Sequence, residues 1–149
     1  MYRGIAQDGC GDASRAMTHE RCRRMVEIQK ALGYMPFPGS LNMTLDKPFD
    51  YSQPHIEADL LNPKTNRDWT GDWKPATFRF WPIKVNGVAC HAVLPKGKTR
   101  PELFLEVYAP VRLRDHGKEF SIAHAQAGWK VTKRFGSERH PMMRLEPCR

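Results

Sequence analysis

The dipeptide Asn86-Gly87 is the sequence feature that most restricts how this chain can fold. It separates two runs, 76–84 and 88–94, that are rich in β-branched and aromatic residues. Both residues tolerate the positive φ angles that tight two-residue turns require, and Asn-Gly between such runs is the strongest short hairpin signal. The sequence therefore predicts a β-hairpin at this point.

The remaining patterned segments predict a mainly β domain with one principal helix. In residues 41–45, three apolar side chains alternate with Asn42 and Thr44, as in a half-buried strand. Residues 18–32 place Cys22, Met25, Val26 and Leu32 on one helical face. Further strands are expected at 2–6, 103–108 and 119–123. A chain of 149 residues fits a single domain with one core.

Two regions carry weaker signals. Residues 46–75 are rich in Pro, Asn, Asp and Trp, which favours a long excursion with at most short elements. Within it, His55, Glu57 and Asp59 share a strand face, where they either bind a metal or belong to a solvent-facing surface. Residues 126–149 form a basic tail that either wraps around the rest of the domain or is partly disordered.

Composition limits the class of protein and its partners. The net charge of +8 and the pI near 9.6 favour a polyanionic partner, either nucleic acid or a nucleoside triphosphate. The same charge is also explained by a surface that only keeps the protein soluble. No apolar run approaches a membrane span, and the N-terminus lacks a signal-peptide pattern, so a cytoplasmic location is expected. The four cysteines match neither a zinc site nor a disulfide framework, which indicates free thiols. Cys90 and His91 are expected to point to opposite faces of a strand.

The turn at residues 36–42, with the sequence PFPGSLN, combines a restricted backbone with oxygen ligands. Its two prolines fix φ, and Gly39 can adopt a conformation closed to other residues. If the backbone is extended from Ser40, the Ser40 hydroxyl and the Asn42 carbonyl oxygen point to one side, where they suit a Mg²⁺ that also binds phosphates. A turn that simply begins a strand has the same signature.

Two other segments suggest anion and substrate chemistry. Residues 8–14 hold Gly9 and Gly11 among small side chains just before the predicted helix, so their N–H groups can approach a phosphate, although neither a dinucleotide fingerprint nor a P-loop is present. In residues 103–108, Glu106 shares a face with Phe104 and Tyr108. A carboxylate on an apolar face is expected either to pair with a cation or a hydrogen-bond donor or to have a functional role.

Three segments together resemble the archaeal CTP-dependent riboflavin kinases: GCGDAS at 9–14, LGYMPFPGSLN at 32–42 and LEVYAPVRLR at 105–114. The resemblance covers roughly residues 2–122. It implies a single domain over residues 1–149, a small six-stranded cradle-loop β-barrel, and transfer of the γ-phosphoryl of CTP to riboflavin, giving FMN and CDP. It leaves open a nucleic-acid-binding or regulatory barrel, or a non-catalytic homologue that binds flavin or nucleotide.

The same resemblance assigns site residues. It implies that Ser40 and Asn42 bind Mg²⁺ and that Thr99 and Glu106 contact the flavin. By residue type, Asp12 and Glu106 are the candidates for a general base. The nucleotide would contact Gly9, Cys10, Gly11, Asp12, Ala13, Ser14, Val111, Arg112, Leu113 and Arg114. The chain departs from the family pattern in having Ser40 where threonine is usual, and Asp115-His116-Gly117-Lys118 in place of a Leu-x-Asp-Gly-Asp turn.

Overall fold

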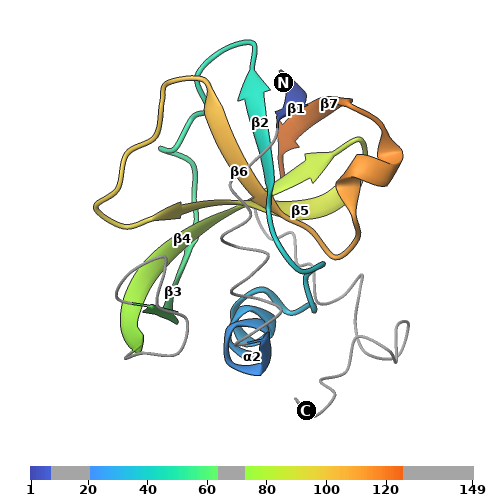
Figure 1. Ribbon diagram of the computed structural model, residues 1–149. Coiled ribbons are helices and arrows are strands. Elements are labelled where there is room, and N and C mark those ends of the chain that lie inside the picture. Colours follow the sequence, from blue (N-terminus) through green and yellow to red (C-terminus); the bar gives the residue numbers. More distant parts are fainter. Residues whose placement is uncertain (8–20, 64–72, 126–149) are drawn as a thin grey trace.

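The computed structural model describes residues 1–7, 21–63 and 73–125 (Figure 1). In chain order the elements are β1 (Tyr2–Gln7), α2 (Arg21–Leu32), β2 (Leu41–Leu45), β3 (Ile56–Pro63), β4 (Trp73–Val85), β5 (Val88–Pro95), β6 (Phe104–Tyr108), the short 3-10 helix η1 (Leu113–His116) and β7 (Glu119–His124). The expected strands are all present, with small differences at their ends, and α2 covers the described part of the expected helix.

The strands form one antiparallel sheet that closes on itself. Their order is β3-β4-β5-β6-β2-β1-β7, and an additional pairing of β4 with β7 joins the two sides. Six strands, β4, β5, β6, β2, β1 and β7, therefore form a ring, while β3 continues the sheet outside it (Figure 1). The prediction of a mainly β fold with a six-stranded barrel and one principal helix is confirmed.

The predicted hairpin joins β4 to β5. Asn86 has φ 48° and Gly87 has φ 81°, the backbone conformation of a primed two-residue turn. Val85 pairs with Val88 directly across the turn, and the pairing continues to Phe78 and Pro95. Because β4 is 13 residues long, it can pair with three strands, β3, β5 and β7.

The expectation that residues 46–75 hold at most short elements is wrong. Strand β3 is eight residues long and pairs with β4 from Ile56 opposite Phe80 to Pro63 opposite Trp73. The polar residues and the proline of this segment weaken any strand pattern, and the strand is held by its partner and by Leu60, which is fully buried beneath helix α2. Eight residues of the excursion therefore form a strand that pairs with β4.

The sheet has an apolar cluster on each face. Inside the ring lie Met43, Trp81, Ile83, Leu105 and Ile122, among others. Helix α2 lies outside the ring (Figure 1). There Ile28 and Leu32 form a second buried cluster with side chains of β3, β4, β5 and β6. Strand β5 is covered on both sides, so nearly all of it is buried. Phe78, Phe80 and Trp81 are all core residues.

Within the described part of the chain, no helix combines the length and the apolar character needed to cross a membrane.

Candidate functional site

The turn at 36–42 is attached to the end of strand β6. Gly39 has φ 109°, a conformation that L side chains rarely adopt, as its position in the turn predicted. The N–H of Phe37 donates a hydrogen bond of 2.7 Å to the carbonyl of Ala109. The chain then enters β2 at Leu41, so the turn delivers Ser40 and Asn42 beside β6.

Ser40 and Asn42 both lie next to Glu106. The Ser40 hydroxyl donates a hydrogen bond of 2.6 Å to Oε2 of Glu106. Asn42 lies directly opposite Glu106 in the pairing of β2 with β6. The Glu106 side chain is 16% exposed. A serine, an asparagine and a carboxylate are thus gathered at one place from strands more than 60 residues apart.

The Asn42 carbonyl oxygen is buried and, among the described residues, has no hydrogen-bond partner. Leaving a buried acceptor unpaired costs about 1–3 kcal/mol, so native proteins rarely tolerate one without a role for it. A neutral amide oxygen next to a hydroxyl is a typical hard ligand pair for Mg²⁺, which takes its other ligands from water and phosphates. The residues present therefore fit the cation that the sequence suggested.

A cleft of about 190 Å³ opens beside this group. One wall is the turn and the start of β2, and the other is the end of β6 with the segment that follows it. It is lined by Phe37, Pro38, Gly39, Ser40, Leu41, Val107, Ala109, Val111, Arg112, Leu113 and Arg114. The structure thus places the four residues 111–114, expected to contact a nucleotide, against the turn that carries Ser40.

The cationic residues of the cleft are held in place from outside it. Arg112 forms an ion pair with Asp115 at 3.0 Å, and both side chains are largely exposed. Arg114 donates a hydrogen bond of 2.7 Å to the carbonyl of Gln7, the last residue of β1. Gln7 in turn lies opposite Asn42 in the pairing of β1 with β2.

The predicted phosphate-binding segment lies outside the described residues. This applies to Gly9, Cys10, Gly11, Asp12, Ala13 and Ser14, and therefore to Asp12 as a candidate base. Only its starting point is defined, because β1 ends at Gln7 beside Asn42.

The loop between β5 and β6 brings Arg100 to the site. Arg100 Nη2 lies 3.5 Å from Oε1 of Glu106, and its guanidinium lies over the ring of Phe104, 5.6 Å from the centroid. Thr99, the expected flavin contact, is exposed in the same loop. The sequence analysis did not identify Arg100. Its only signal was its position beside Thr99.

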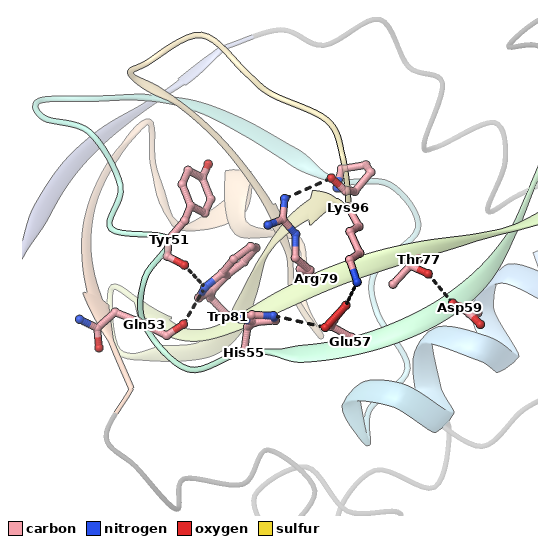
Figure 2. Close-up of polar contacts among 10 residues, drawn as sticks. Tyr51, Gln53, His55, Glu57, Asp59, Thr77, Arg79, Trp81 and Lys96 are labelled. Atoms are coloured by element: carbon pink, nitrogen blue, oxygen red, sulfur yellow. Dashed lines mark hydrogen bonds and ion pairs between the residues drawn. The ribbon is translucent and has the colours of Figure 1, made fainter.

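The acidic residues of β3 belong to the surface. Glu57 faces Lys96 and His55 (Figure 2), with N···O distances of 3.3 Å and 3.8 Å, and Asp59 accepts a hydrogen bond of 2.7 Å from Thr77. No group of three or more His, Cys, Asp or Glu residues in the described part of the chain is arranged to hold a metal ion. Of the two interpretations of His55, Glu57 and Asp59, the surface one is confirmed.

The adjacent Cys90 and His91 do point to opposite faces of β5. Cys90 belongs to the cluster inside the ring, whereas His91 contacts Tyr34 on the other face. Burial raises the pKa of the Cys90 thiol to about 12, so it is a poor nucleophile. Cys90 is a free structural thiol, as expected, and the side chains of the other three cysteines lie outside the described part.

Fold and site together define a small antiparallel β-barrel protein in which the side-chain oxygens of Ser40, Asn42 and Glu106 are grouped beside a cleft. The family model CTP-dep_RFKase, whose description is "Domain of unknown function DUF120", matches residues 7–120. This match covers most of the chain, and the protein belongs to that family.

Curated relatives carry the name riboflavin kinase. The chain is 31% identical to the riboflavin kinase of Pyrobaculum aerophilum over 117 residues, and this aligned region covers 75% of this chain and 52% of the relative. It is 28% identical over 117 residues to that of Archaeoglobus fulgidus, covering 76% and 47%, and 33% identical over 99 residues to that of Haloquadratum walsbyi, covering 61% and 41%. The chain thus spans about half the length of the curated relatives that it matches.

Proposed function

We propose that the protein is a Mg²⁺-dependent kinase that transfers the γ-phosphoryl group of CTP to the ribityl 5′-hydroxyl of riboflavin, giving FMN and CDP. The family name and the names of the relatives support the reaction. The structural observation that carries the proposal is the buried Oδ1 of Asn42, which has no hydrogen-bond partner among the described residues and lies two positions along the chain from Ser40 in the wall of the cleft.

Ser40 Oγ and Asn42 Oδ1 would hold the cation. Mg²⁺ bound there would neutralise charge on the phosphate oxygens and orient them for in-line transfer. Phosphoryl transfer depends mainly on positioning and electrostatic stabilisation, so two neutral protein ligands are sufficient if phosphates and waters supply the others. The serine hydroxyl provides the same kind of ligand atom as the threonine usual in the family.

The cleft would receive the nucleotide. Its volume is smaller than the roughly 300–1,000 Å³ of typical ligand pockets, so its described walls would form part of the nucleotide site. Val111 and Leu113 offer apolar contact, and Arg112 and Arg114 offer positive charge near the phosphates. The segment from Gly9 to Ser14, which begins just beyond Gln7, would supply backbone N–H groups to the phosphate chain.

The acceptor would lie on the side of Glu106 and Thr99. These two residues are proposed flavin contacts, and Glu106 and Asp12 remain the candidates for a general base. Both oxygens of Glu106 already have partners, Ser40 and Arg100. The carboxylate would therefore have to exchange one of these partners to accept a proton from the substrate.

The direct test is to incubate the purified protein with Mg²⁺, riboflavin and each of the four nucleoside triphosphates, and to detect FMN by chromatography. FMN formation with CTP, and its loss in EDTA, is the expected result. A folded protein that forms no FMN with any donor would reject the activity. Tight riboflavin or nucleotide binding without turnover would identify a non-catalytic binding homologue instead.

A further inference from the structure

We propose that Glu106 is a positioning residue for the metal site, which orients the Ser40 hydroxyl so that its lone pairs face the cation. The inference rests on the proposed function and gives Glu106 a role beyond flavin contact. It starts from the 2.6 Å hydrogen bond that Ser40 Oγ donates to Oε2 of Glu106.

The hydrogen bond fixes where the hydroxyl proton lies. A serine hydroxyl has one donor hydrogen and two acceptor lone pairs, and it rotates freely unless a partner fixes it. The length of 2.6 Å is that of a charge-assisted bond between a hydroxyl and a carboxylate. With its proton directed at Glu106, the oxygen of Ser40 can present only lone pairs to a metal ion.

Strand pairing fixes the carboxylate relative to the second proposed ligand. Glu106 lies opposite Asn42 in the ladder between β2 and β6 and opposite Val93 in the ladder between β6 and β5. Its backbone is therefore held from both sides. One residue of a barrel strand thus sets the orientation of Ser40 and lies opposite Asn42, whose side-chain oxygen has no hydrogen-bond partner within the residues that the structure describes.

Arg100 holds the other carboxylate oxygen. Its Nη2 lies 3.5 Å from Oε1, and the Phe104 ring lies beneath its guanidinium. This contact offsets the negative charge of Glu106 and leaves Oε2 directed at Ser40. Removing a residue that hydrogen-bonds a metal ligand, as Glu106 does with Ser40, typically changes metal affinity or activity 10–100-fold.

The positioning role and the flavin-contact role predict different results when riboflavin is absent. A residue that only contacts the flavin has no effect on the binding of CTP with Mg²⁺. A residue that orients Ser40 does affect this binding. Binding measurements without riboflavin therefore separate the two roles, and they do not require turnover.

The experiment is isothermal titration of the full chain with CTP in Mg²⁺ and, separately, in EDTA, without riboflavin. We expect Glu106→Leu, which removes the acceptor, to weaken Mg²⁺-dependent CTP binding at least about tenfold while leaving the metal-free binding unchanged. Glu106→Gln keeps an acceptor oxygen, so its loss should be smaller. Glu102→Leu makes the same change at an exposed carboxylate four residues earlier and serves as the matched control.

A double-mutant cycle with Ser40→Ala tests whether Glu106 acts through Ser40. In the Ser40→Ala background, Glu106→Leu should cause no further loss, because no hydroxyl remains to be oriented. Additive losses, or unchanged Mg²⁺-dependent affinity in Glu106→Leu, would overturn the positioning role while leaving the kinase proposal intact. If the wild-type protein shows no Mg²⁺-dependent CTP binding, the metal site itself is rejected, and the positioning role with it. Thermal unfolding of each variant identifies any that is misfolded, and Ser40→Thr, which retains the hydroxyl, should bind as the wild type does.

Discussion

The Tyr34 hydroxyl lies 3.0 Å from Nδ1 of His91, and both side chains are fully buried between helix α2 and the barrel. The same hydroxyl donates a hydrogen bond of 3.1 Å to the carbonyl of Tyr108. Burial lowers the pKa of His91 to about 3 and raises the pKa of Tyr34 well above its ordinary value, so both groups are neutral. This pair links the residue just before the turn at 36–42 to strands β5 and β6, and β6 carries Glu106 and Val107 of the site.

Replacing Tyr34 by phenylalanine should destabilise the fold. The substitution keeps the ring but leaves a buried imidazole nitrogen and a buried carbonyl without the hydroxyl, which costs about 1–3 kcal/mol in the free energy of unfolding. Urea denaturation measures this loss. Tyr51→Phe is the matched control, because Tyr51 is only half-buried, its hydrogen bond with Trp81 is accepted by its backbone carbonyl, and its ring contact with Trp81 is kept in phenylalanine. An effect no larger than that of the control would show that the hydroxyl contributes nothing to stability.

Stability should fall on the acid side through His91. The pKa of His91 is about 3 in the folded protein and 6.5 in the unfolded chain, so only the unfolded state gains a proton between these values. The contribution of neutral His91 to the free energy of unfolding is therefore fully present above pH 6.5. It is lost as the pH falls towards 3, by at most roughly 1.4 kcal/mol per pH unit. Comparing the unfolding free energy of wild type and His91→Gln from pH 7 to pH 4 isolates it.

Two other groups titrate on the acid side in the same direction. Hydrogen bonds from Gln53 and Ser52 lower the pKa of Asp50 to about 2, and burial lowers the pKa of His124. Both groups remain in the His91→Gln variant, so the difference between the two stability curves removes them. Parallel curves across this range would contradict the assignment of a neutral, buried His91.

Asn42→Ala should separate stability from ligand binding. Removing a buried oxygen that has no partner among the described residues should change the free energy of unfolding by less than about 1 kcal/mol. The same change removes a proposed Mg²⁺ ligand, so titration should show CTP binding in Mg²⁺ weakened at least about tenfold. A strongly destabilised variant with unchanged nucleotide affinity would mean that Asn42 has a structural role.

Gly39→Ala tests the backbone of the cleft wall. At φ 109° an alanine is strained, and such strain costs of order 1–3 kcal/mol. If the turn relaxes instead, Ser40 is displaced from Glu106, and Mg²⁺-dependent CTP binding weakens with less loss of stability. Denaturation and titration of one sample distinguish these routes. A variant with both properties unchanged would show that the turn does not depend on this conformation.

Local signals in the sequence were sufficient for much of the fold. Asn86-Gly87 defined its hairpin because the positive φ angles are a property of those two residues, and the alternation of Leu41, Met43 and Leu45 identified β2 because one face of that strand is buried. Strand β3 was missed because its stability comes from pairing with β4 and from one buried leucine, neither of which produces a periodic pattern.

The site was predicted in part for the same reason. Ser40 and Asn42 stand two residues apart, so the sequence alone suggests that they converge. The contact of Ser40 with Glu106 joins residues separated by 66 positions, and Arg100 reaches Glu106 from a loop. Such contacts depend on the closure of the barrel and on loop geometry, so the spacing of residues along the chain does not predict them.

Barrel closure also has a consequence for how the protein is made. Tyr2 pairs with Ile122, and β4 completes the ring by pairing with β7 up to His124. During synthesis β1 therefore cannot complete its pairing until β7, the last described strand, has been made. Until then β1 and β4 each have an edge with unpaired backbone N–H and C=O groups. A ribosome-bound chain ending before Glu119 should accordingly be sensitive to protease, whereas one that exposes His124 beyond the exit tunnel should become resistant.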